Sequence, residues 1–194
     1  GARPGDLIFV SGELGTSRLG LEVLRAGLKS VSPPLKRAVR AHLYPQPRLH
    51  LARALRRRFL LTAMIDVSDG LSTDLDHLCQ ASGVGAVLYA AQIPAVRLPR
   101  RRRGLPEPVA RRLGVSELEL ALHGGEDYEL LFTLPASAAA HVPVRLAGVR
   151  LHHIGRVVRG RKIMLVDAQG RAQRLFPGGW DHFARTKGAT GRAR

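Results

Sequence analysis

The sequence predicts an α+β fold in which a layered, mixed β-sheet packs against helices. Apolar segments of strand length are interspersed with segments whose apolar residues recur at helical spacing. The region before the C-terminal tail contains several short strand-like runs separated by turn residues. Hydrophobic residues make up 45% of the 194 residues, enough to form a domain core, which excludes a disordered or fibrous chain.

The first third of the chain is expected to contain one strand and two helices. Residues 6–11 form the strand, which ends at Gly12 and the turn at 15–17. Ser17 is expected to cap one helix, and a second helix begins near Pro47. The helices carry apolar residues on one face, namely Leu19, Val23, Leu24 and Leu28 in the first, and Leu49, Ala52 and Leu55 in the second. Between them, Ser32-Pro33-Pro34 is expected to break the chain.

In the middle of the chain, residues 62–66 form an apolar run typical of a strand covered on both faces, and 84–89 form another strand. A helix between them is marked by apolar residues at helical spacing: Leu71, Leu75, Leu78 and Cys79. Residues 92–104, which contain prolines and four successive arginines, are expected to form an exposed loop.

The rest of the chain is expected to form a helix, a strand and a second helix, followed by three strands. Ser116 is expected to cap a helix over 117–122, a strand follows at 128–134, and Pro135 opens a helix containing 138–140. Further strands are predicted at 153–158, 162–166 and 171–176. Residues 1–183 are expected to form one domain, and the basic residues 184–194 a disordered tail.

The chain is strongly basic, with 31 Lys and Arg against 15 Asp and Glu, giving a net charge of +16. This charge would suit a nucleic-acid-binding module. However, the basic residues are scattered and aromatic residues make up only 5% of the chain, so base-stacking platforms are scarce. Compositional bias is the favoured interpretation, and nucleic acid is an unexpected partner.

Composition also bears on the compartment of the protein. No stretch approaches the roughly 20 apolar residues that span a bilayer, and the first residues lack the apolar run of a secretory signal. A single cysteine, Cys79, excludes an internal disulfide and fits the reducing cytoplasm. Because the sequence does not begin with Met, it is expected to be part of a longer chain.

The strongest local motif is residues 65–72, where an apolar strand ends in two aspartates and a helix follows at once. Asp66 and Asp69 are spaced so that their carboxylates can converge on one hard cation, which prefers oxygen ligands. The start of the helix offers N–H groups to a phosphate. Alternatively, Ser68 or Asp69 caps the helix without any ligand. Spacing alone leaves these two interpretations evenly balanced.

Two further motifs contain candidate ligand-binding residues. In residues 123–132, two glycines precede Glu126 and Asp127, which on a strand would point to opposite faces; a solvated turn is the favoured alternative. In residues 178–183, two glycines precede Trp180, whose ring can stack on a cationic heteroaromatic ring. A lone Trp near a terminus more often seals the edge of a core.

Taken in order, the motifs resemble the thiamine-monophosphate kinase family. The matching segments are Pro4-Gly5-Asp6 through Gly20-Leu21, His42 through Arg48, Asp66 through Leu71, Gly124 through Leu130, and Gly179 through Phe183. The resemblance implies the C-terminal domain fold of the wider aminoimidazole-ribonucleotide-synthetase-like superfamily. His123 departs from the family pattern, which has a small polar residue there, and no catalytic role is expected for it.

The resemblance also implies the activity and the site residues. Asp66 and Asp69 are expected to bind Mg²⁺, Ser68 to contact ATP, and Glu126 and Trp180 to contact thiamine monophosphate. The implied reaction is direct transfer of the ATP γ-phosphoryl group to thiamine monophosphate, for which no catalytic nucleophile is required.

In the family, an N-terminal domain supplies further Mg²⁺-binding aspartates and the homodimer interface, and it is absent here. This chain is therefore expected to form one wall of an active site and to be inactive alone. A sibling ATP-using enzyme of the same superfamily is the nearest alternative, and a basic nucleic-acid-binding module is the alternative from another class.

Overall fold

The computed structural model describes residues 1–28, 32–98, 107–114 and 116–179. In the described part of the chain, eight strands form one sheet in the order β2-β4-β1-β6-β3-β7-β8, with β5 paired to β6. The neighbouring strands pair antiparallel except β3 and β7, which are parallel. The predicted α+β fold with a mixed sheet is therefore confirmed. The strands are β1 (Leu7–Ser11), β2 (Ala63–Val67), β3 (Gly85–Tyr89), β4 (Glu129–Leu134), β5 (Arg145–Leu146), β6 (Val149–Val158), β7 (Ile163–Val166) and β8 (Ala172–Arg174).

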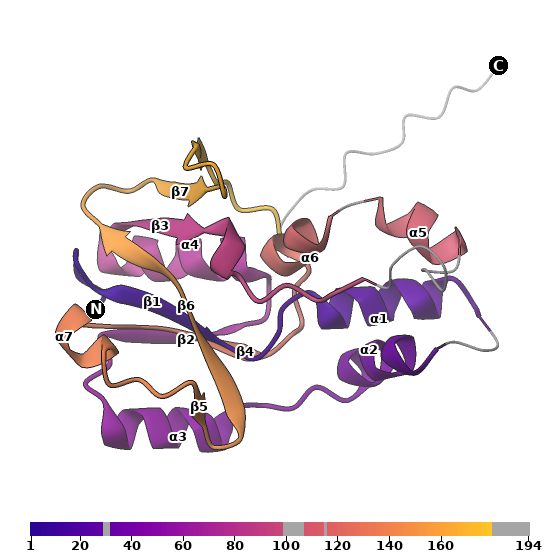
Figure 1. Cartoon of the computed structure of the whole chain (residues 1–194), viewed down its shortest axis with the longest axis horizontal. Coiled ribbons are helices and arrows are strands. Elements are labelled where there is room, and N and C mark those ends of the chain that lie inside the picture. Colours follow the sequence, from indigo (N-terminus) through magenta and orange to yellow (C-terminus); the bar gives the residue numbers. More distant parts are fainter. Residues whose placement is uncertain (29–31, 99–106, 115, 180–194) are drawn as a thin grey trace.

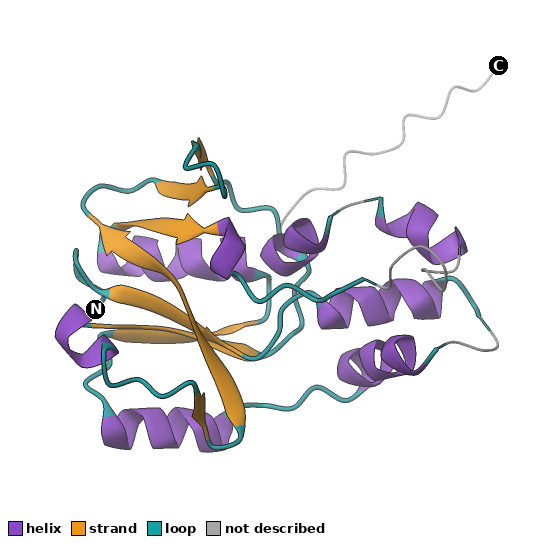
Figure 2. Ribbon diagram, viewed as in Figure 1, coloured by secondary structure: helices purple, strands orange, loops and turns teal. Residues whose placement is uncertain are grey.

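The helices form two groups, as Figures 1 and 2 show. The helices α4 (Leu71–Ser82) and α3 (Leu49–Arg58) run along the sheet, whereas the others except α7 gather beyond one end of it. These others are α1 (Thr16–Arg25), α2 (Pro33–Leu43), α5 (Glu107–Leu113) and α6 (Glu117–His123); α7 (Ala136–Ala139) and the short 3₁₀ helix η1 (Ala90–Gln92) complete the set. None of the described helices is long and apolar enough to cross a membrane.

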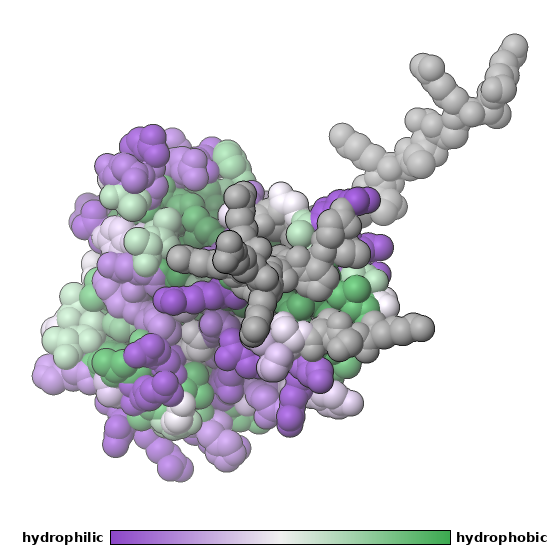
Figure 3. Space-filling view, turned by 45° about the vertical axis from the view of Figure 1, so that its right-hand side comes forward, coloured by the Kyte–Doolittle hydropathy of each residue, from purple (hydrophilic) through white to green (hydrophobic). Residues whose placement is uncertain are grey.

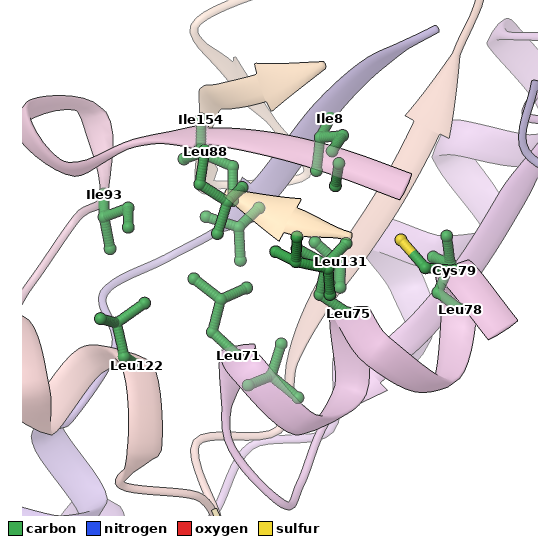
Figure 4. Close-up of a cluster of buried hydrophobic side chains, with 14 of the residues drawn as sticks. Ile8, Leu71, Leu75, Leu78, Cys79, Leu88, Ile93, Leu122, Leu131 and Ile154 are labelled. Atoms are coloured by element: carbon green, nitrogen blue, oxygen red, sulfur yellow. The ribbon is translucent and has the colours of Figure 1, made fainter. Parts of the chain in front are cut away.

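Strand alternation distributes the core over both faces of the sheet. In β1, Ile8 and Val10 pack into a cluster with the apolar face of α4, while Phe9 packs into a second cluster with α3. Figure 4 shows the first cluster, in which Leu71, Leu75 and Leu78 of α4 face Ile8, Leu88, Leu131 and Ile154. Each fully buried leucine contributes about 1.5–3 kcal/mol, so these contacts fix α4 and the loop before it against the sheet.

The helix α2 corrects a sequence prediction. Pro33 and Pro34 do not break the chain but occupy the first positions of this helix, where a missing N–H costs no hydrogen bond. Its residues Leu35 and Ala38 pack against Leu19 and Val23 of α1 in a third buried cluster. This additional helix forms a wall of the site described below.

Two other predictions about burial need correction. Strand β2, which ends the sheet in the described part of the chain, is covered on both faces but only in part: Ala63 and Ile65 pack against the first cluster and Met64 against the second, while Val67 is the one fully buried residue of the strand. Within the segment 92–104, which was expected to be an exposed loop, Ile93 and Val96 are 7% and 3% exposed. Residues 99–106 lie outside the described residues, as does the predicted tail at 184–194.

Candidate substrate cleft and metal-binding loop

A cleft of about 760 Å³ lies at the end of the sheet that faces the helices α1 and α2. Its walls come from the β1–α1 loop, α2 and the segment after it, residues 93–97, the loop before β4 and the start of β6. Carboxylates and bases both line it. The acidic residues are Glu13, Glu117, Glu126, Asp127 and Glu129, and the basic residues are Arg37, Arg48, Arg97, Arg150 and His152. Hydrophilic side chains cover much of the molecular face drawn in Figure 3, with smaller apolar areas between them.

A buried ion pair lies in one wall of the cleft. Arg48 donates two hydrogen bonds to Glu129, from Nε to Oε2 at 3.0 Å and from Nη2 to Oε1 at 2.6 Å. The Glu129 side chain is only 5% exposed, and its carboxylate also accepts a hydrogen bond from Ser11. Ser11 Oγ in turn accepts from the Leu130 N–H at 2.9 Å. The hydrogen bond to Glu129 raises the pKa of Arg48 above its usual value. This network fixes the segment after α2 against β1 and β4.

Asp127 caps helix α1 from a distant part of the sequence. Its carboxylate accepts hydrogen bonds from the Gly15 N–H at 2.7 Å and the Ser17 N–H at 3.0 Å. Gly15, and not Ser17 as expected, occupies the N-cap position, and it has no side chain to do this. Burial raises the pKa of Asp127 to about 7, although the two backbone hydrogen bonds oppose that change. Asp127 is thus a structural part of the cleft rather than part of a solvated turn.

Glu126 points in another direction from its neighbour. Strand β4 begins only at Glu129, so Glu126 and Asp127 lie in the turn before the strand, which was the favoured interpretation of this motif. Glu126 has a left-handed backbone conformation with φ of 57°. Its carboxylate, 58% exposed, lines the cleft and lies 3.2 Å from Nδ1 of His42.

The loop at 66–70 contains the predicted metal ligands. Asp66 is an exposed residue of β2, and Asp69 lies in the turn before α4. Ser68 and Asp69 do not cap this helix: Gly70 is its N-cap residue, without a side-chain hydrogen bond. Instead, Asp74 Oδ2 accepts from the N–H groups of Asp69 and Gly70, at 3.0 and 3.1 Å. The capping alternative is therefore wrong.

Asp69 has further carboxylate oxygens nearby. Among the described residues, one atom each of Asp69, Asp74 and His77 lie within 4.8 Å of one another, and Asp66 does not belong to this group. Burial raises the pKa of Asp74 to about 6. Carboxylate oxygens fit a hard cation such as Mg²⁺, whereas the His77 nitrogen is a poor ligand for it. The donor chemistry of Asp66 and Asp69 is thus compatible with Mg²⁺.

Backbone hydrogen bonds join the cleft to this loop. The Glu126 N–H donates to the Ser68 carbonyl at 2.7 Å, and the Tyr128 N–H donates to that of Val67 at 2.9 Å. Gly125 permits this approach, because a Cβ added there would lie 2.9 Å from the Ser68 oxygen. The predicted site residues Ser68 and Glu126, far apart in sequence, are therefore brought side by side.

The two glycines of the motif at 178–183 lie against the start of α4, next to the loop at 66–70. The Gly178 N–H donates to Ser72 Oγ at 3.2 Å, and the Gly179 N–H donates to Thr73 Oγ1 at 3.1 Å. Ser72 Oγ lies 2.8 Å from Nδ1 of His123, so His123 helps to hold the start of α4. Trp180 lies outside the described residues. The segment that precedes it lies against the first turn of α4.

Sequence reasoning assigned no role in the cleft to several residues that the structure places there. The structure adds His42 and Arg48 as direct partners of Glu126 and Glu129, and Ser11 and Ser17 as hydrogen-bonding groups behind them. His42 and Arg48 are the two ends of one of the segments that carried the family resemblance. That match was the signal available in the sequence.

The fold and the site define an α+β domain with a polar cleft and a carboxylate loop at one end of a mixed sheet. The chain matches the family model of the AIR synthase related protein, C-terminal domain, over residues 3–167. It therefore belongs to that family.

The chain is also similar to individual proteins, which share one name. The chain is 35% identical over 183 residues to the thiamine-monophosphate kinase of Aquifex aeolicus, covering 94% of this chain and 53% of that protein. It is 36% identical over 187 residues to the enzyme of that name from Escherichia coli O157:H7, covering 95% and 54%. A solved structure of AaThiL complexed with AMPPCP and TMP superposes with a TM-score of 0.73 at 33% identity, covering 94% of this chain and 53% of that one. The chain thus spans about half the length of the curated relatives it matches.

Proposed function

We propose that this chain is the C-terminal half of a thiamine-monophosphate kinase, which uses ATP to convert thiamine monophosphate to thiamine diphosphate. The observation that carries the proposal is the backbone pairing of the Asp66–Asp69 loop with the Glu126 loop. This pairing sets a carboxylate loop suited to Mg²⁺ beside a cleft large enough for a small ligand. The likeness to AaThiL complexed with AMPPCP and TMP supports the same substrates for this chain.

Each predicted site residue has a distinct role in this proposal. Asp66 and Asp69 would hold Mg²⁺, and Ser68 would contact ATP beside them. Glu126 contacts the organic cation of thiamine monophosphate, because its exposed carboxylate lines the cleft. Trp180, which follows Gly179 at the first turn of α4, is assigned to the same substrate.

The reaction requires positioning rather than a protein nucleophile. An oxygen of the thiamine monophosphate phosphate forms a bond to the γ-phosphorus of ATP, while the bond from that phosphorus to its bridging oxygen breaks and ADP leaves. Bound Mg²⁺ supplies neutralisation of the phosphate charge. The protein holds the two phosphates in line, and the buried Arg48–Glu129 pair keeps the cleft wall in place.

The remaining parts of the active site are assigned to an N-terminal half, which would also form a homodimer interface. We infer that residues 1–183 form one domain and that the enzyme is cytoplasmic, which fits the single cysteine of this chain. A sibling activity on another small substrate is tested directly by supplying aminoimidazole precursors in place of thiamine monophosphate.

The decisive experiment compares two proteins: the full-length enzyme containing this chain, and residues 1–194 alone. Formation of thiamine diphosphate is followed with ATP and Mg²⁺ present, and host enzyme is excluded with a purified inactive variant prepared in parallel. We expect turnover by the full-length enzyme and none by residues 1–194. A full-length enzyme without turnover contradicts the proposed function; turnover by residues 1–194 contradicts the division of the active site between two halves.

A further inference from the structure

His42 contacts two residues at the cleft that are distant from it in the sequence. Its Nδ1 lies 3.2 Å from Oε2 of Glu126 and 2.9 Å from Oγ of Ser17. The His42 side chain is 16% exposed, while that of Glu126 is 58% exposed. A largely buried imidazole at the end of α2 therefore contacts an exposed carboxylate that lines the cleft.

The Glu126 side chain needs such a contact to hold one orientation. Its backbone is fixed by the hydrogen bond to Ser68 and by a positive φ, but its long side chain extends into the open cleft. An exposed glutamate samples several rotamers, and holding it in one has an entropic cost. In the described part of the chain, His42 is the ion-pairing partner of this carboxylate.

Hydrogen bonding determines which nitrogen of His42 carries a proton. A carboxylate at 3.2 Å from Nδ1 is favourable only when Nδ1 carries a hydrogen, which Ser17 Oγ can share as an acceptor. With a hydrogen on Nδ1, the same edge of the imidazole contacts both the Glu126 carboxylate and the Ser17 hydroxyl.

We propose that His42 is a positioning residue that holds the Glu126 carboxylate over the cleft, in the orientation that receives the cationic thiazolium ring of thiamine monophosphate. This inference rests on the proposed function. His42 acts through Glu126, and Ser17 at the first turn of α1 fixes the imidazole ring.

The test uses isosteric replacements in the full-length enzyme. The His42→Ala change should raise KM for thiamine monophosphate about five-fold, with kcat and KM for ATP nearly unchanged, because binding energy is lost from one substrate only. His42→Asn, whose amide N–H lies near the position of Nδ1, should restore most of the affinity. His42→Gln, which places its amide near the position of Nε2, should not. His50→Ala, at an exposed histidine of α3, is the control and should have no effect.

A double-mutant cycle separates positioning from a general structural role. In a Glu126→Gln background, His42→Ala should change KM for thiamine monophosphate less than two-fold, because the group that it positions is already altered. Effects that simply multiply would overturn the inference, as would an unchanged KM in His42→Ala. An enzyme that does not phosphorylate thiamine monophosphate at all contradicts the proposed function instead, and the inference fails with it.

Discussion

The backbone N–H of Glu126 lies 2.7 Å from the carbonyl oxygen of Ser68. This hydrogen bond and that from Tyr128 to Val67 continue the pairing of β2 with β4 into the two loops beyond the strands. The register of two strands thereby sets the distance between the proposed Mg²⁺ loop and the proposed substrate cleft. Changes at this junction should affect both sites together.

Gly125 offers the most direct test of this junction. Gly125→Ala places a methyl group 2.9 Å from the Ser68 oxygen at a backbone with φ of +68°. Gly148→Ala is a matched control, because Gly148 has φ of +80° and nothing within 4 Å. Both variants should lose about 1–2 kcal/mol of folding stability from left-handed strain. Only Gly125→Ala should also reduce turnover, at least ten-fold. Equal turnover in both variants would contradict a functional role for the junction.

Removing Arg48 should destabilise the fold. Arg48→Ala leaves Glu129, which is 5% exposed, buried without its ion-pair partner. We expect a loss of about 2–4 kcal/mol in the free energy of unfolding, somewhat less than for a fully buried pair since Arg48 is 29% exposed. Urea unfolding measures this loss.

The control for Arg48 is another cleft arginine. Arg37 pairs with Glu13 at 3.2 Å, with side chains 71% and 40% exposed. Arg37→Ala should therefore cost less than about 1 kcal/mol. A loss for Arg48→Ala as small as that for Arg37→Ala would show that the buried pair does not hold the cleft wall.

The raised pKa of Asp127 predicts a specific pH dependence of stability. The folded protein binds a proton at Asp127 up to about pH 7, whereas the unfolded chain releases it near its ordinary value of 3.8. Stability from this group is therefore present at low pH and is lost as pH rises from about 4 to 7. Asp127→Asn should remove this loss. The free energy of unfolding of the variant, minus that of the unmodified protein, should therefore increase as the pH rises from 4 to 8. A difference that stays constant across that range would argue against a buried, protonatable Asp127.

The metal assignment is tested at Asp66. The side chain of Asp66 is exposed, so Asp66→Asn should leave the fold intact. Turnover by the full-length enzyme should be lost, because an amide is a much poorer ligand for Mg²⁺ than a carboxylate. Asp76→Asn, on α4 outside the loop, is the matched control and should retain activity. Near-normal kcat of Asp66→Asn at saturating Mg²⁺ would remove Asp66 from the metal site.

The local sequence was sufficient to predict elements whose structure depends on residues close together in the chain. The spacing of Leu71, Leu75 and Leu78 determined one helix, and Ser116 forms the predicted cap, with its Oγ accepting from the Glu119 N–H at 3.2 Å. The motif around Glu126 was a candidate site because of the family resemblance, whereas its residues alone favoured a solvated turn. Pro33 and Pro34 misled the prediction of α2, because prolines both break helices and begin them, and only packing on α1 distinguishes the two cases.

Only the tertiary structure decided which residues meet in the cleft. Arg48 and Glu129 are 81 positions apart, and Asp127 caps a helix that begins more than 100 positions earlier. No local pattern records such pairs, because they depend on strand order and on the packing of α2, not on neighbouring residues. The sequence by itself determined the chemical groups of the site. The fold of the sheet determined their partners, since hydrogen bonds and ion pairs form between whichever groups the packed backbone brings within about 3 Å.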